Sequence, residues 1–189
     1  MSSDEEAIER LVRLLDQVGI PYMLTGSIAS SHHGLPRATN DADVVIDPTP
    51  ESLDRLLAVL AAEGYYADAS VAREALRHRR QFNVIDPETA FKIDLIVRKD
   101  RPFSVEEFAR RERRQLIGMT VAVARAEDVI LSKLEWAKKA GGSEKQLEDA
   151  AGVLAVNPGV DRAYVERWAR ELGVLDLWRE IAGEEPASD

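Results

Sequence analysis

The hydrophobic pattern of this chain changes once, near residue 125, and the change limits the folds open to it. Before that point, stretches with the period of β-strands alternate with helical stretches, whereas the rest of the chain is helical in pattern. Strands that alternate with helices predict a sheet covered by helices. We therefore expect an α/β (α+β) fold, in which residues 1–125 form a core with a mixed β-sheet flanked by helices. Residues 126–189 are expected to form a C-terminal helical extension packed on that core.

The length is sufficient for a hydrophobic core without covalent staples. A chain of 189 residues and 21.0 kDa can bury about 70% of its extended surface. The sequence contains no cysteine, which excludes disulfides, thiolate metal sites and a cysteine nucleophile. Its apolar runs are much shorter than the roughly 20 residues of a membrane span, and its acidic start is unlike a secretory leader. We expect a cytoplasmic protein that does not enter a membrane.

The charge is unevenly distributed. The chain has 25 Lys and Arg against 34 Asp and Glu, a net charge of −9, which argues against broad, non-specific coating of DNA. Residues 71–114 nevertheless carry 12 basic and 8 acidic side chains. The simplest interpretation is a solvated helix face with charged loops, although this stretch could also face a polyanion.

Local patterns predict further elements. Residues 81–85 and 90–97 are expected to pair as a β-hairpin, because turn-forming residues separate them. A charged helix is expected over residues 104–113 and a short strand over residues 120–124. Three tryptophans of the helical region lie among apolar residues, which favours core or interface packing over base stacking: Trp136, Trp168 and Trp178.

Two aspartates interrupt an apolar strand. In residues 41–46, alternation places Asp41 and Asp43 on one face and the apolar side chains on the other. Their Cα atoms are then roughly 7 Å apart, so both carboxylates can reach one cation and repel each other without it. The alternative is a strand end exposed to water, with Asp41 as a turn residue.

A third carboxylate lies on a second apolar strand. Asp94 is flanked by isoleucine and leucine, and burying a carboxylate costs several kcal/mol unless it is paired or bound to metal. Lys92 lies two residues away on the same face, so a local ion pair is the alternative to a metal. Together with Asp41 and Asp43, Asp94 makes an oxygen-only ligand set suited to Mg²⁺ or Mn²⁺, ions that commonly bring phosphates with them.

A glycine and a serine stand where a strand meets a helix. Residues 22–25 are expected as a strand and Gly26-Ser27 as the start of the next helix. Glycine lets a ligand approach the backbone, and the free amides of a helix start receive anions. Such a turn is also common without a ligand, and the glycine patterns of phosphate-binding and dinucleotide-binding loops are absent.

Taken in order, these segments resemble the nucleotidyltransferase (DNA polymerase β-like) superfamily. The matching segments are Gly26-Ser27, Asp41-Ala42-Asp43 and Ile93-Asp94-Leu95, within residues 22–97. The resemblance implies a nucleotidyltransferase-like sheet. It also implies a metal-dependent enzyme that moves a nucleoside monophosphate from a nucleoside triphosphate (NTP) to a hydroxyl of RNA, protein or a small molecule.

A finer resemblance concerns the residues before the aspartates. Arg37 and Thr39 precede Asp41 and Asp43 as in the nucleotidyltransferases of the abortive-infection type IV toxin group. In that group a lysine and a later aspartate on C-terminal helices complete the site, and the matching residues are Lys133 and Asp149. The chain is shorter than typical toxins of the group and is closer to its compact relatives. Helix geometry independently places Lys133 within an apolar arc, where it either extends to solvent or points at a phosphate.

The resemblance assigns roles to nine residues. The catalytic residues and ligands of Mg²⁺ or Mn²⁺ are Asp41, Asp43 and Asp94. The residues that hold the nucleotide are Gly26, Ser27, Arg37, Thr39, Lys133 and Asp149.

A non-catalytic interpretation stays open. The same cleft could bind a nucleotide or a partner protein without turnover, for example as one component of a toxin–antitoxin pair. A preserved set of acids favours activity without proving it.

Overall fold

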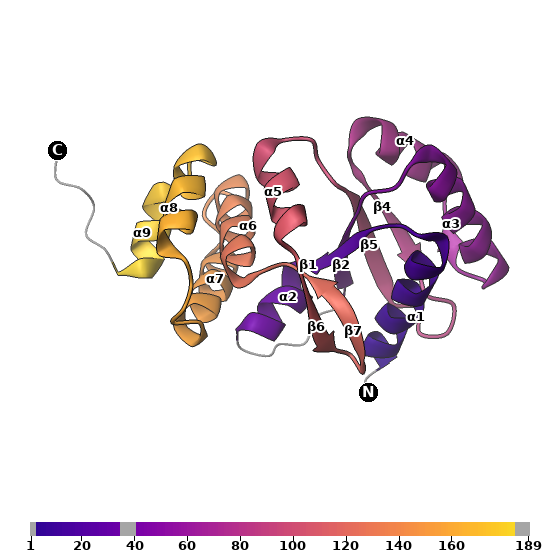
Figure 1. Cartoon of the computed structure of the whole chain (residues 1–189), viewed down its shortest axis with the longest axis horizontal. Helices are drawn as coiled ribbons and strands as arrows, with labels where there is room; N and C mark the ends of the chain where they lie inside the picture. The colour runs from indigo at the N-terminus through magenta and orange to yellow at the C-terminus, as the bar shows by residue number, and fades with distance from the viewer. Residues whose placement is uncertain (1–2, 35–40, 184–189) are drawn as a thin grey trace.

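The computed structural model describes residues 3–34 and 41–183 and shows helices on both sides of one β-sheet (Figure 1). In chain order the helices are α1 (Ser3–Val18), α2 (Gly26–His33), α3 (Pro50–Ala62), α4 (Ala69–His78), α5 (Pro102–Arg110), α6 (Ala126–Lys139), α7 (Glu144–Val156), α8 (Arg162–Glu171) and α9 (Leu175–Ala182). The strands are β1 (Tyr22–Thr25), β2 (Asp41–Ile46), β3 (Tyr66–Ala67), β4 (Gln81–Ile85), β5 (Lys92–Val97), β6 (Glu112–Leu116) and β7 (Met119–Val123).

The sheet is mixed, as the sequence predicts. Its strand order is β3-β4-β5-β2-β1-β7-β6. The central strand β2 runs parallel to β5 and antiparallel to β1, while β4–β5 and β6–β7 are antiparallel hairpins. The chain therefore has an α/β (α+β) fold, and the α/β prediction is confirmed.

The two faces of the sheet differ in burial. Along β2 the side chains alternate between buried and half-buried, with Ala42, Val44 and Ile46 on the buried face. Helices α1, α3 and α4 lie together at one end of the molecule, and their apolar side chains belong to the same hydrophobic core as this buried face (Figure 1). The opposite face of β2, β4 and β5 keeps polar and partly exposed side chains. That open face is where the two predicted aspartates of β2 project.

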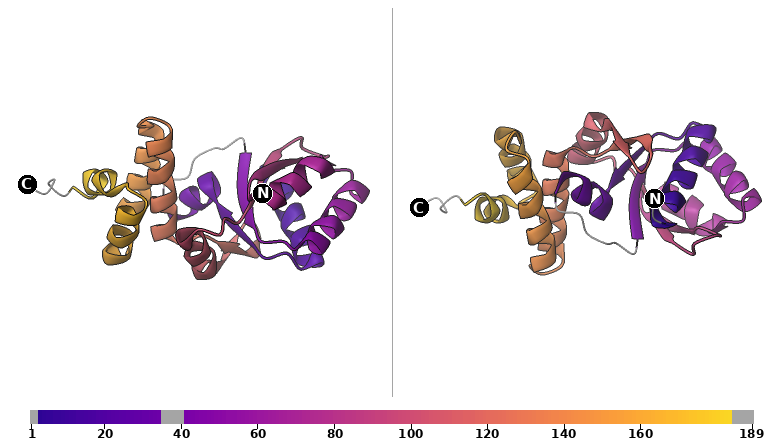
Figure 2. Two further views of the ribbon diagram at one scale, coloured as in Figure 1. Left: turned by 90° about the horizontal axis from the view of Figure 1, so that it is seen from above. Right: turned by 90° about the horizontal axis from the view of Figure 1, so that it is seen from below.

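The C-terminal helices stack at the other end of the molecule (Figure 2). Helix α6 packs against α2, α7 and α8, and α9 packs against α7 and α8. Trp168 and Trp178 are 8% and 1% exposed, so their predicted core packing is confirmed. Across residues 3–34 and 41–183, none of the helices has the length and apolar character needed to cross a membrane.

Two local predictions are wrong at their ends. The helix expected to reach residue 113 ends at Arg110, and the chain then forms the edge strand β6. Ile117 and Gly118, with φ of 51° and 77°, form the two-residue turn of the β6–β7 hairpin, and the arginine-rich β6 lacks the apolar alternation that marks a strand. Strand β5 begins at Lys92, because Ala90 adopts φ of 57° and ends the turn instead.

Candidate active site

The open face of the sheet carries a polar row across three strands. Thr25 of β1 lies opposite Asp43 of β2, which in turn lies opposite Asp94 of β5. Neighbouring strands are about 4.8 Å apart, so the carboxylates of Asp43 and Asp94 project side by side. Asp41 lies two residues along β2 on the same face. The fold thus brings together the three carboxylates that the sequence singles out.

Glycine is the only residue type that fits at position 26, beside this polar row. It has φ of +60°, a conformation that costs an L-residue about 1–2 kcal/mol. A Cβ on Gly26 would lie 2.0 Å from Oδ2 of Asp43. The missing side chain therefore lets the start of α2 approach the Asp43 carboxylate directly.

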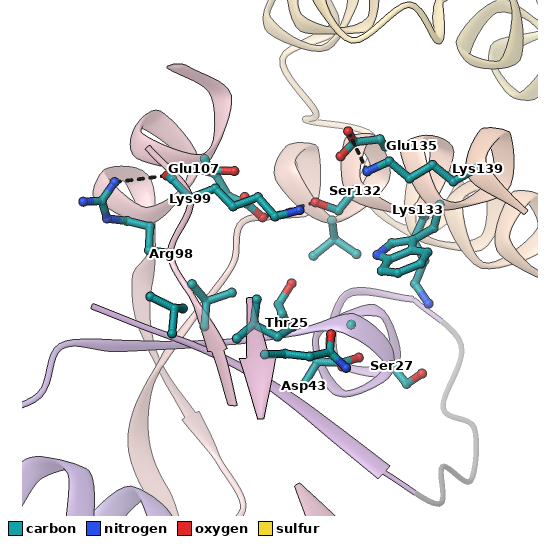
Figure 3. A pocket seen from close by; sticks show the side chains of 18 of the residues that line it. Thr25, Ser27, Asp43, Arg98, Lys99, Glu107, Ser132, Lys133, Glu135 and Lys139 are labelled. Carbon is teal, nitrogen blue, oxygen red and sulfur yellow. Dashed lines mark hydrogen bonds and ion pairs between the residues drawn. The ribbon is translucent and has the colours of Figure 1, made fainter. Parts of the chain in front are cut away.

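The start of α2 is open to an anion. Thr25 is its N-cap residue but forms no side-chain capping hydrogen bond, which leaves the first-turn amides without that partner. Ser27 follows on the first turn and lines the same cavity as Gly26 and Asp43 (Figure 3). Backbone amides at a helix start suit a phosphate group.

The carboxylates destabilise one another in the absence of a cation. Burial, followed by the negative charges of Asp41 and Asp94, raises the pKa of Asp43 to about 6. Lys133 and Lys92 oppose this shift without cancelling it. A divalent cation at this position would remove the repulsion.

Asp94 supplies the clearest sign of a missing partner. Its side chain is almost fully buried, and Oδ2 accepts a hydrogen bond from Nζ of Lys92 at 3.0 Å, as the local ion-pair alternative expects. Oδ1 is buried as well, yet no described residue donates a hydrogen bond to it. An orphaned carboxylate oxygen beside two further carboxylates fits a hard cation, which binds oxygen ligands.

The three aspartates do not form a preassembled metal site. Among the described residues, no group of three or more His, Asp or Glu side chains is arranged to hold a metal ion. Mg²⁺ is commonly held by one or two carboxylates together with water and substrate phosphates, so the donor set fits an ion that binds with a nucleotide.

Lys133 reaches the same cavity from the C-terminal helices, and Asp149 pairs with it. Lys133 on α6 is 5% exposed, and its Nζ lies 2.8 Å from Oδ2 of Asp149 on α7. Lys133 lines the same cavity as Asp41 and Asp43, and its positive charge opposes the rise in the pKa of Asp43. Asp149 holds the ammonium of Lys133 there. The predicted residues Arg37 and Thr39 lie outside the described residues.

A cavity of about 670 Å³ extends from this site along the open face. Its walls are the sheet, α5, α6 and the start of α7 (Figure 3). Trp136 lines it and is 59% exposed, so core packing is wrong for this tryptophan, while interface packing stays a prediction. The periodicity of α6 could not distinguish it, because Trp136 lies one turn beyond Lys133 at the border of the buried arc.

The far end of the cavity holds five charged residues and a serine that the sequence does not reveal. They come from the β5–α5 connection and from α5 and α6, and no motif links them: Lys99, Arg101, Glu107, Ser132, Glu135 and Lys139. Asp47, just after β2, pairs at 3.0 Å with Arg98, which lines the cavity. Asp47 is therefore separate from the three aspartates of the polar row.

Comparison with solved structures identifies the fold. The crystal structure of ANT(2″)-Ia in complex with adenylyl-2″-tobramycin matches with a TM-score of 0.61 and 14% identity, over 91% of this chain and 98% of that one. A nucleotidyltransferase-like antigenic protein from Paracoccidioides brasiliensis matches with 0.58 and 20% identity, over 100% and 97%. The lincomycin-bound lincosamide antibiotic adenylyltransferase LnuA matches with 0.56 and 11% identity, over 80% and 97%.

By sequence alone there is no comparable match. No protein-family model and no curated protein matches the chain. The likeness thus lies in the arrangement of the helices and strands, and the chain has the nucleotidyltransferase fold.

Proposed function

We propose that the protein is a metal-dependent nucleotidyltransferase, which moves a nucleoside monophosphate from an NTP to a hydroxyl acceptor. The observation that carries the proposal is the row of Asp43 and Asp94 beside Gly26, with the buried Oδ1 of Asp94 lacking a partner among the described residues. Two proteins of the same fold support it by what they are named for: ANT(2″)-Ia is described with adenylyl-2″-tobramycin, and LnuA as an antibiotic adenylyltransferase.

The residues divide the work of the reaction. The amides at the start of α2 and the hydroxyl of Ser27 bind the terminal phosphates. Mg²⁺ or Mn²⁺ bound by the three aspartates would neutralise the triphosphate and acidify the acceptor hydroxyl. Asp94 accepts the proton of that hydroxyl. The acceptor oxygen then bonds to the α-phosphorus, and the bond from the α-phosphorus to the leaving pyrophosphate breaks.

The C-terminal helices complete the nucleotide site. Lys133 neutralises charge on the phosphates, and Asp149 positions its ammonium. Arg37 and Thr39 are proposed to contact the nucleotide from the segment before β2. In this arrangement residues 1–125 supply the aspartates and residues 126–189 supply the lysine, so neither part is sufficient alone.

The alternative is a module that binds a nucleotide or partner protein without turnover, such as one component of a toxin–antitoxin pair. Such a module does not require three acids on one face, nor the exclusion of a side chain at residue 26. The presence of both features favours catalysis.

The test uses Asp43→Asn. The purified protein is incubated with each labelled NTP, Mg²⁺ and cell extract, and label transfer and pyrophosphate release are measured. Wild-type protein should transfer label, whereas Asp43→Asn should lose transfer and keep its fold. Asp54→Asn is the matched control, because Asp54 pairs with Arg73 on exposed helices away from the cavity. Equal transfer by Asp43→Asn and wild type would overturn the assignment.

A further inference from the structure

The far end of the cavity has the opposite charge to the aspartate end. Lys99, from the β5–α5 connection, and Arg101, at the start of α5, line it together with Lys139 of α6. We call these three residues the basic arm. Figure 3 shows Lys99 extending toward Ser132 on α6, with the ion pair of Glu135 and Lys139 beside it.

The basic arm has more positive charge than its neighbours neutralise. Glu135 pairs with two of its members, with Arg101 through a bond of 2.6 Å and with Lys139 at 3.0 Å. No ion pair with any described residue is formed by Lys99. Glu107 lines the same end, but burial raises its pKa to about 8, so it is largely protonated at neutral pH. Three cations thus face one ionised carboxylate.

The surrounding charges do not reverse this excess. Arg98 and Arg79 also line the cavity, but Asp47 and Asp100 neutralise both of them. Arg80 lines it as well, and within the described part of the chain it has no acidic partner.

The pKa of Lys99 reflects both its burial and the neighbouring positive charges. Partial burial, and then the charges of Lys139 and Arg101, lower the pKa of Lys99. Bound anions relieve such repulsion between like charges. A polycationic acceptor would increase the repulsion between the positive charges.

The basic arm lies at the opposite end of the cavity from the proposed triphosphate site. That site is at Gly26, beside Asp43 and Asp94. Strand β5 continues from Asp94 to Val97, about 10 Å at the rise of a strand, and Lys99 follows two residues later. We therefore assign an anion on the basic arm to the other substrate.

We propose that the basic arm binds a phosphate of the acceptor, so that the acceptor is a hydroxyl compound that also carries phosphate. The inference rests on the proposed function and names its substrate class. Phosphate fits better than carboxylate, because two ammonium groups and a guanidinium line the space and a phosphate group offers them more acceptor oxygens. A small phosphorylated compound and the 3′ end of an RNA share this chemistry.

The first test measures binding without catalysis. Inorganic phosphate is titrated calorimetrically into the protein in EDTA, and Mg²⁺–NTP is titrated separately. The double variant K99Q/K139Q should bind phosphate at least about tenfold more weakly than wild type, since it loses two charge-assisted hydrogen bonds to the anion. Its affinity for Mg²⁺–NTP should change less than twofold. Wild-type protein that binds no phosphate at millimolar concentration, or a double variant that binds it equally well, would overturn the proposal.

The matched control is Lys138→Gln. Lys138 is on the same helix but donates to the backbone oxygen of Gly173, outside the cavity. It should bind phosphate as wild type does. A loss in this variant as large as in K99Q/K139Q would show a general charge effect and count against a site.

The second test identifies the source of the phosphate. Cell extract is treated with phosphatase or with ribonuclease, and the phosphatase or ribonuclease is then removed. Label transfer from NTP to the treated extract by the wild-type protein is measured. Loss of acceptor activity after phosphatase indicates a small phosphate monoester, and loss after ribonuclease indicates RNA; either supports the proposal. An acceptor that survives both treatments overturns it, while transfer itself continues to report on the aspartate site.

Discussion

The contact between Gly26 and Asp43 joins two requirements at one residue. The backbone at Gly26 needs a positive φ, and the space where a Cβ would lie is filled by the Asp43 carboxylate. The motif Gly-Ser indicates the glycine from sequence alone. The reason for it requires the register, because Thr25 faces Asp43 only once β1 and β2 have paired.

Gly26→Ala should therefore lower both stability and activity. The positive φ costs about 1–2 kcal/mol for alanine, and the methyl group displaces the Asp43 carboxylate from its position. Urea denaturation measures the first effect and pyrophosphate release the second. Gly152→Ala on α7 is the control: nothing lies within 4 Å of its added Cβ, and alanine in a helix should stabilise by about 0.5–1 kcal/mol. Full activity in Gly26→Ala would contradict the close approach at Asp43.

Asp43 also determines how metal-free protein responds to pH. Its pKa is raised in the fold to about 6, from 3.8, so the folded state binds more protons than the unfolded state between these values. Stability from this group is therefore lost as pH rises from about 4 to 6 and stays lost above, by up to about 3 kcal/mol. In EDTA, Asp43→Asn should melt higher than wild type at pH 7 and lose the advantage near pH 4. A difference in melting temperature between the two proteins that stays constant from pH 4 to pH 7 would contradict the proposed repulsion at Asp43.

At the scale of elements, the pattern of a segment predicted its structure where one of its faces is buried. The alternation in β2 indicated both its buried face and its aspartates. Strand β6 could not be predicted from its sequence, because it is an exposed edge whose side chains are mostly charged. The basic arm could not be predicted for a different reason: its residues come from the β5–α5 connection, the start of α5 and α6, and only the tertiary fold brings them together.

The contact between the β4–β5 turn and α1 also could not be predicted from the sequence. Asp86, whose residue type is common in turns, has a fully buried side chain in the β4–β5 turn. Its oxygens accept hydrogen bonds from Arg10 of α1 at 2.8 and 3.1 Å and from the Thr89 hydroxyl at 2.9 Å. These bonds outweigh burial and lower the pKa of Asp86 to about 2. The turn is thereby fastened to α1.

Arg10→Gln should destabilise the protein strongly, because it leaves the buried Asp86 carboxylate without its cation. Breaking a buried pair by removing one partner costs about 3–5 kcal/mol. The double variant Arg10→Gln with Asp86→Asn should recover part of the loss, as no charge is then buried. Stability from Asp86 is present above its unfolded pKa of 3.8 and is lost as pH falls through about 2, so urea denaturation at pH 7 and pH 2.5 should give a smaller wild-type advantage at the lower pH. Equal stability of Arg10→Gln and wild type at pH 7 would contradict this account.

At the scale of the whole molecule, the cavity lies where the sheet meets the C-terminal helices. Lys133 and Asp149 come from those helices, while Asp43 comes from the central strand. The motifs predicted each group separately, and the apolar arc of α6 indicated that Lys133 was unusual. The sequence could not predict the cavity between the groups or the opposite charges at its two ends, because these depend on how α5, α6 and the sheet pack.

A ligand that joins these parts should stabilise the entire fold. Mg²⁺ or Mn²⁺ relieves the repulsion of Asp41, Asp43 and Asp94 only in the native state, and a hundredfold excess over its dissociation constant stabilises by about 2.7 kcal/mol. The melting temperature should rise with millimolar Mg²⁺ and rise further with Mg²⁺ and NTP together, because the nucleotide then also engages Lys133. NTP alone should have little effect, since its phosphates meet unshielded carboxylates.

Differential scanning fluorimetry of wild type, Asp43→Asn and Asp54→Asn distinguishes specific binding from a general salt effect. Asp54→Asn should respond to Mg²⁺ as wild type does, because Asp54 is exposed and away from the cavity. Asp43→Asn should lose the response, since it removes the carboxylate at the centre of the polar row. If wild-type protein melts at the same temperature with and without Mg²⁺, Mn²⁺ and every NTP, the aspartates do not bind a metal. They would then be strand residues without a bound ligand, with Lys92 as the sole partner of Asp94 among the described residues.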